Sequence, residues 1–244
     1  SPVENIEASE ERFLLLQKAN DSLGELEVYA KGQSQPLLTL SFFESGYPLD
    51  MAFHEDGRAF DLVLLNVNHA QPGMLVHRYN DRGEKTAEMA LPGAELLPAI
   101  YLLNDDCTVL FNNETIVLAD IGQGKILYRE SFEKIEDLAL TANYMAVLLD
   151  EGEQSGLHIL RKTGDSFSFE HLDSFSKLDG DLLLVNSGES IFLAQGNIIR
   201  AYDFAGGRFL AESELSERVV NLIAQDNNTL IVLTEKNGYL FSLD

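Results

Sequence analysis

The sequence has little cysteine, no tryptophan and few basic residues. Its 244 residues contain one cysteine, Cys107, which excludes an intrachain disulfide and a cysteine-rich metal site. We expect Cys107 to be an unreactive thiol beside a turn. No apolar run approaches the roughly 18 residues that a membrane-spanning helix needs. These absences predict a domain that folds outside the bilayer and needs no covalent cross-link.

The charge balance narrows the choice of partners. Lys and Arg together number 17 and Asp and Glu number 40, which gives a formal net charge of −23. Binding of nucleic acid or of an anionic lipid surface needs clustered basic residues, so we expect this domain to bind neither directly. The hydrophobic fraction of 45% is typical of a folded domain and argues against disorder.

Six short β-like segments of similar character recur along the chain. They begin at residues 26, 74, 115, 157, 198 and 239, so successive segments are 41 to 48 residues apart. A period this regular indicates a repeat architecture. Within each period a turn rich in Asn, Asp and Gly precedes a more continuously apolar run, such as Tyr144–Leu149. Each period can therefore be divided into four short strands.

Four strands in about 40 residues are what one blade of a β-propeller requires. We therefore predict an all-β fold, a six-bladed β-propeller of four-stranded antiparallel blades that forms a single domain over residues 1–244. Stacking the blades buries both apolar faces of each sheet. Helical periodicity is weak and confined to residues 4–17 and 212–222. The predicted units are approximately 1–43, 44–92, 93–133, 134–175, 176–215 and 216–244.

The last unit stops after its third strand, so one blade is predicted to be incomplete. Residues 2–8 fit either the outer position of the last blade or the inner strand of the first blade. Their match to Val219–Ala224 favours the second placement. Sequence upstream of Ser1 is another source of the missing strand.

Two segments carry a resemblance to a known repeat. Ala119–Tyr128 resembles the quinoprotein-type propeller repeat, which has an Ala-x-Asp step, a tight Gly-containing turn and a strand that ends in Trp; Ala201–Leu210 is a looser copy. The resemblance implies a propeller of the quinoprotein-like or WD40-like kind. Quinone-dependent dehydrogenases of that superfamily also use more blades, calcium, a catalytic Asp and a vicinal disulfide, and a single cysteine excludes the last feature. A vaguer similarity is to extracytoplasmic propeller domains of membrane-anchored proteins in Gram-positive bacteria.

No paired catalytic or metal-binding motif is present in the sequence. The histidines form no His-x-His or His-x-x-x-His pair, so we predict no metal site and no catalytic residue. Five of the six units place a short polar residue near the start of the first strand, which lines the channel of a propeller. These would form a ring that binds a polar ligand or Ca²⁺, or they are simply the Asx residues that turns favour. They are Asn5, Asp50, Asp137, Asp181 and Asn221.

The expected function is that of a non-catalytic binding or scaffolding propeller. The chain starts at Ser1-Pro2-Val3 without an initiator methionine, which predicts an extracytoplasmic, membrane-tethered domain whose upstream sequence has been removed, although composition fits a cytoplasmic protein equally well. We expect a monomer that binds protein or glycan through its loops or channel mouth. The alternative is a metal-assisted hydrolase or lyase that uses Asp50, Asp137 or Asp181 at the same mouth.

Overall fold

The chain is seen in a computed structural model, which describes residues 3–8, 12–19, 23–41, 46–54, 57, 59–66, 73–93, 95–104, 106–141, 144–163, 165–180, 182–225 and 229–243. It divides into two compact units, residues 1–130 and 131–244. The described residues form 23 strands and one three-residue 3-10 helix. No helix among them is long and apolar enough to cross a bilayer.

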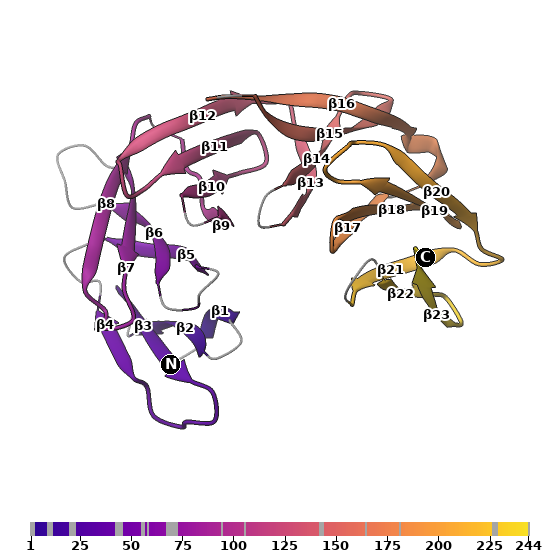
Figure 1. The fold of residues 1–244 in the computed structure, drawn as a ribbon. Coiled ribbons are helices and arrows are strands. Elements are labelled where there is room, and N and C mark those ends of the chain that lie inside the picture. Colours follow the sequence, from indigo (N-terminus) through magenta and orange to yellow (C-terminus); the bar gives the residue numbers. More distant parts are fainter. Residues whose placement is uncertain are drawn as a thin grey trace. The chain divides into compact units, whose positions relative to one another are not determined.

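The first unit contains three sheets, in which strands that follow one another in the chain pair with one another (Figure 1). The first sheet consists of β1 (Val3–Ala8), β2 (Arg12–Ala19), β3 (Leu23–Ala30) and β4 (Leu38–Ser41). The second consists of β5 (Tyr47–Phe53), β6 (Phe60–Asn66), β7 (Gly73–Tyr79) and β8 (Lys85–Leu91). The third consists of β9 (Ala99–Asn104), β10 (Cys107–Phe111), β11 (Thr115–Asp120) and β12 (Lys125–Ser131).

The second unit repeats this arrangement, and its last sheet has three strands in the described part of the chain. Its first sheet consists of β13 (Ile135–Leu140), β14 (Met145–Asp150), β15 (Gln154–Thr163) and β16 (Ser166–Ser176). The 3-10 helix η1 (Lys177–Asp179) leads into β17 (Leu182–Ser187), β18 (Ser190–Gln195), β19 (Ile198–Asp203) and β20 (Phe209–Glu214). The last sheet consists of β21 (Val219–Ala224), β22 (Thr229–Thr234) and β23 (Gly238–Ser242).

These meanders confirm the predicted all-β class and the four-stranded antiparallel sheets. The pairing of β1 with β2 places residues 3–8 as the first strand of the first sheet, which is the second of the two placements considered. The two segments with weak helical periodicity contain strands instead, because β1, β2, β20 and β21 pair with neighbouring strands.

Burial along the strands explains the sequence pattern. In β18 all six residues are buried, as expected for a central strand covered on both faces. In β20, at the outer edge of the same sheet, exposed residues outnumber the others and alternate with them towards the end of the strand. Central strands therefore appear in the sequence as continuous apolar runs, and outer strands as mixed polar segments.

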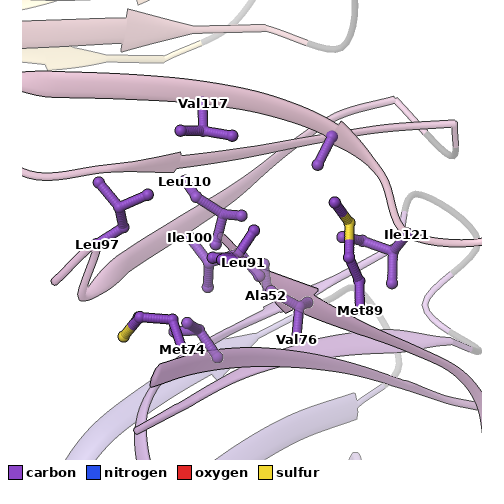
Figure 2. Packing of buried hydrophobic residues seen from close by; sticks show 12 residues of the cluster. Ala52, Met74, Val76, Met89, Leu91, Leu97, Ile100, Leu110, Val117 and Ile121 are labelled. Carbon is purple, nitrogen blue, oxygen red and sulfur yellow. The ribbon is translucent and has the colours of Figure 1, made fainter. Parts of the chain in front are cut away.

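The apolar core lies between neighbouring sheets. In the first unit, Val76 and Met89 of the second sheet pack with Leu110 and Val117 of the third, and all are buried (Figure 2). In the second unit, side chains of β14 and β15 pack with those of β18 and β19, among them the fully buried Tyr202. Each sheet thus depends on its neighbour to exclude water from its apolar face.

Candidate ligand-binding site

Four of the five residues predicted to bind a ligand share one backbone feature. The strands β1, β5, β13 and β21 each have an irregularity of register, typical of a β-bulge, directly before the polar residue. The fifth residue, Asp181, lies outside the described residues, as does the side chain of Asn5. The bulges lie at Val3/Asn5, Pro48/Asp50, Ile135/Asp137 and Val219/Asn221.

The described side chains at these bulges accept backbone hydrogen bonds. Oδ2 of Asp50 accepts one from the N–H of Ile100 at 3.1 Å, which ties β5 to β9, the first strand of the next sheet. Asp137 does the same in the second unit, because its carboxylate accepts hydrogen bonds from the N–H groups of Leu138 and of Leu184 on β17. Oδ1 of Asn221 accepts the N–H of Leu222 at 2.9 Å. Asp50 and Asp137 therefore join neighbouring sheets.

Asn5 and Asp50 belong to the first unit, and Asp137 and Asn221 to the second. Within the second unit Asp137 also lines a cavity, of about 290 Å³. A ring formed by all five residues, with a ligand or Ca²⁺ at its centre, stays a prediction. The cavity beside Asp137 is the place where the structure surrounds one of these residues with other functional groups.

Charged groups of both signs line the cavity beside Asp137. Nζ of Lys177 forms an ion pair with Oε1 of Glu136 at 3.1 Å and a shorter one with Oδ1 of Asp150. Nζ of Lys134 lies 3.8 Å from the other carboxylate oxygen of Asp150. Glu136, Lys134 and Lys177 all border the cavity. The result is a polar hollow in which acidic and basic groups are held close together.

The protonation of these groups follows from their partners. The hydrogen bond between Lys177 and Asp150 raises the pKa of the lysine and lowers the pKa of the aspartate. Burial raises the pKa of Asp137, although its two backbone hydrogen bonds favour the ionised form. A cationic partner would therefore favour the ionised form of Asp137.

The 3-10 helix η1 positions Lys177. Oγ of Ser176 caps the helix by accepting the N–H of Leu178 at 3.3 Å, and Gly180 ends it with a φ of 107°. The side-chain amide of Gln195, on β18, donates to the carbonyls of Ser176 at 2.6 Å and Gly180 at 3.1 Å. Both ends of the helix are therefore fixed to a central strand of the following sheet.

A second cavity, of about 280 Å³, is lined by Ser176, Lys177 and Leu178 and so shares Lys177 with the first. Its lining includes Glu153, Gln154 and Leu178, and Leu178 is 95% exposed. Hydrogen bonds at both ends of η1 hold this exposed apolar side chain in place. We call η1 and the two cavities that it helps to line the η1 groove. The η1 groove was not predicted from the sequence, where the break in the β pattern after Ser176 is a signal for it.

The first unit contains a separate buried polar cluster around Asp61, whose side chain is fully buried. The carboxylate accepts hydrogen bonds from Nε of Arg78 at 2.8 Å, from Nη2 of Arg78 at 2.9 Å and from Oγ1 of Thr108 at 2.8 Å. Nε2 of His54 lies 3.1 Å from it. Because Thr108 belongs to β10 in the next sheet, this cluster joins two sheets and leaves little of the carboxylate for a ligand.

Comparison with solved structures agrees with the sheet arrangement. The β-propeller domain of Cps50 (Swd1) from Myceliophteria thermophila matches with a TM-score of 0.58 and 14% identity over 98% of this chain and 82% of that one. Hsv2 from Kluyvelomyces marxianus matches with a TM-score of 0.61 and 12% identity over 98% and 70%. BamB from Moraxella catarrhalis matches with a TM-score of 0.53 and 12% identity over 94% and 66%.

The meandering sheets and these similarities define the fold as a β-propeller. The chain belongs to DUF5711, a family of unknown function whose model matches residues 1–239. No curated protein matches the sequence. At identities of 12–14% the solved structures are informative about the fold alone.

Proposed function

We propose that this chain is a non-catalytic binding protein that holds a segment of a partner protein in the η1 groove. The observation that carries the proposal is the position of Leu178, which is 95% exposed and lines the second cavity beside Lys177, the residue that both cavities share. Loops held by a rigid β frame are common places for recognition. An exposed apolar residue next to a cavity lined by charged groups also matches the usual anatomy of a binding surface, an apolar centre with a polar rim.

The charges around the groove indicate the chemistry of the partner. Carboxylates of Glu136, Asp137 and Glu153 line the two cavities, and Lys177 is already paired with acidic groups. The net charge of −23 adds a long-range attraction for cations. The preferred segment therefore has a Lys or Arg that pairs with Asp137, next to an apolar side chain that covers Leu178.

A peptide panel tests this proposal. Surface plasmon resonance on the immobilised chain would compare peptides that combine Arg and Leu with peptides in which Glu replaces Arg. We expect the basic series to bind, and Leu178→Ser and Asp137→Asn to weaken it about tenfold, the loss typical of a central contact. Leu210→Ser, which changes another exposed leucine of the second unit, is the matched control.

Two results would remove the proposal. One is equal binding of the basic and acidic series, and the other is unchanged affinity in Leu178→Ser. A panel of oligosaccharides, measured with the same variants, tests for a glycan ligand. Binding of oligosaccharides without binding of peptides would show that the partner is a glycan and not a protein.

We also propose that the six sheets close into one six-bladed, monomeric propeller. Exposed apolar side chains in the first and last sheets support it, because a closed ring would place these two sheets side by side. Ile6 on β1 is 58% exposed, and Leu240 on β23 is 69% exposed. Small-angle scattering tests closure, since a compact monomer of this length has a radius of gyration of about 18 Å. A clearly larger value would contradict it.

A location outside the cytoplasm, with a membrane tether, is also part of the proposal. The only cysteine, Cys107, is buried, so an oxidising compartment would find no accessible thiol among the described residues. Protease treatment of intact cells tests it. Degradation of the chain supports an external domain, and protection until lysis would establish the cytoplasmic alternative.

A further inference from the structure

Three potential metal ligands meet on the second unit, away from any motif visible in the sequence. Glu151, His158 and His171 each offer one ligand atom, and these three atoms lie within 4.8 Å of one another. His158 is on β15 and His171 is directly opposite on β16, with the ring centroids 5.1 Å apart. The pairing of two neighbouring strands thus brings together histidines that are 13 positions apart in the sequence.

The turn between β14 and β15 supplies the third ligand. The N–H of Glu151 donates to the carbonyl of Gln154 at 2.9 Å, which closes a tight turn. The carboxylate then folds back along β15, where its Oε1 lies 2.9 Å from Nε2 of His158. It lies directly over Gly156, and any Cβ at that position would overlap it. Gly156 therefore makes the space in which Glu151 reaches the histidines.

A neighbouring hydroxyl orients one of the histidines. Nε2 of His171 lies 2.8 Å from Oγ of Ser174, on the same strand. Hydrogen bonds of this kind commonly fix the ring orientation of metal-binding histidines. Glu151 and His171 are exposed and His158 is half-buried, so an ion can reach the cluster from solvent.

We propose that Glu151, His158 and His171 form a binding site for a divalent transition metal, with Zn²⁺ as the representative ion. Two imidazole nitrogens and one carboxylate oxygen are a ligand set that suits zinc, whereas Ca²⁺ and Mg²⁺ prefer oxygen alone. Zinc normally takes four ligands, so three protein ligands leave one position for water or for a group of another molecule. The site is separate from the η1 groove and does not depend on the function proposed for it.

Isothermal titration of the full chain with ZnCl₂ tests the proposal. We expect one tight site per chain that persists in excess Mg²⁺. His171→Gln and Glu151→Gln should each abolish or strongly weaken it. Glu170→Gln is the matched control, because Glu170 is an exposed carboxylate on the same strand that pairs with Arg161 and lies outside the cluster.

Gly156→Ala provides a more specific test, because it retains all three ligands. The added methyl group displaces the Glu151 carboxylate, so zinc affinity should fall about tenfold, as for other changes in the surroundings of a metal site. Circular dichroism without zinc establishes that each variant is folded. Because Glu151 is exposed, Glu151→Gln tests the site without disturbing the sheet. Absence of a tight site in the wild type, or wild-type affinity in His171→Gln, would overturn the proposal.

Discussion

Arg78 donates two hydrogen bonds to the fully buried carboxylate of Asp61, from Nε at 2.8 Å and from Nη2 at 2.9 Å. The two residues lie on adjacent strands, β7 and β6, and are opposite each other in the register. Thr108 extends the pair to the next sheet. The pair is bidentate and its carboxylate is fully buried, which distinguishes it from the exposed ion pairs of the outer strands.

Replacing Asp61 should therefore be costly. Asp61→Asn leaves the half-buried Arg78 without the carboxylate charge of Asp61, and we expect a loss of about 3 kcal/mol in the free energy of unfolding, the lower end of the range for a buried pair. Glu212→Gln, which removes an exposed partner of Arg200, should cost less than about 1 kcal/mol. Urea denaturation of both variants checks the contrast. Similar losses in the two variants would show that the Asp61 cluster stabilises the fold no more than an exposed ion pair does.

The same cluster predicts a dependence of stability on pH. Burial alone would raise the pKa of Asp61, but hydrogen bonds from Arg78 and His54 outweigh it and lower the pKa below the ordinary value of 3.8. The unfolded state then takes up its proton first as the pH falls. The contribution of Asp61 is complete at neutral pH, and it is lost as the pH drops below about 4.

Asp137 should contribute to the pH dependence of stability with the opposite sign, because burial raises its pKa above 3.8. Its ionisation costs stability as the pH rises, so Asp137→Asn should be neutral or slightly stabilising at pH values near 7. Urea denaturation of wild type, Asp61→Asn and Asp137→Asn across the acid range measures both effects. If the difference in the free energy of unfolding between wild type and Asp61→Asn stays constant below pH 3.8, the lowered pKa of Asp61 is contradicted.

The packing between sheets predicts a second difference in stability. Leu193, on β18, is 1% exposed and packs with β14 and β15 of the preceding sheet. Leu193→Ala should lower the free energy of unfolding by about 2–5 kcal/mol, because it leaves a cavity between two sheets. Leu210→Ala, on the outer strand β20, should cost far less. Thermal and urea denaturation measure both variants, and equal losses would argue against a core that lies between the sheets.

Gly180→Ala tests the η1 groove without removing any side chain that lines it. Its φ of 107° is disfavoured for any residue with a Cβ, so Gly180→Ala should shift the end of η1 and with it Lys177 and Leu178. We expect weaker binding of the basic peptide series. Gly124→Ala is the control, because Gly124 also has a positive φ, of 62°, but lies in a hairpin of the first unit. Equal peptide affinity in the two variants would show that the conformation of η1 does not affect binding.

Much of the fold was predictable because burial in this chain is local and periodic. All six residues of β11 are buried, so Thr115–Ala119 stands out as an apolar run, and its spacing from similar runs predicts the repeat. The outer strands carry less information. In β16 exposed and half-buried residues alternate only over the first five residues, and the sequence did not define the full extent of this strand.

The functional side chains were harder to predict because they depend on contacts between distant residues. The sequence shows that Asp50 and Asp137 are short polar residues near a strand start. It does not show that each accepts an N–H from the next sheet. Similarly, His158 and His171 become neighbours only through the register of β15 and β16, in which one irregularity shifts the pairing at that point. Lys177 depends on Gln195, which fixes η1 from another sheet.

Amide and methyl NMR of the labelled chain tests whether the η1 groove is the binding surface. Titration with a peptide that combines Arg and Leu should shift the methyl signals of Leu178 and the amide signals of residues 177–180. The signals of Leu210 should stay unchanged. Shifts confined to other parts of the chain, or no shifts with any peptide of the basic series, would contradict the account.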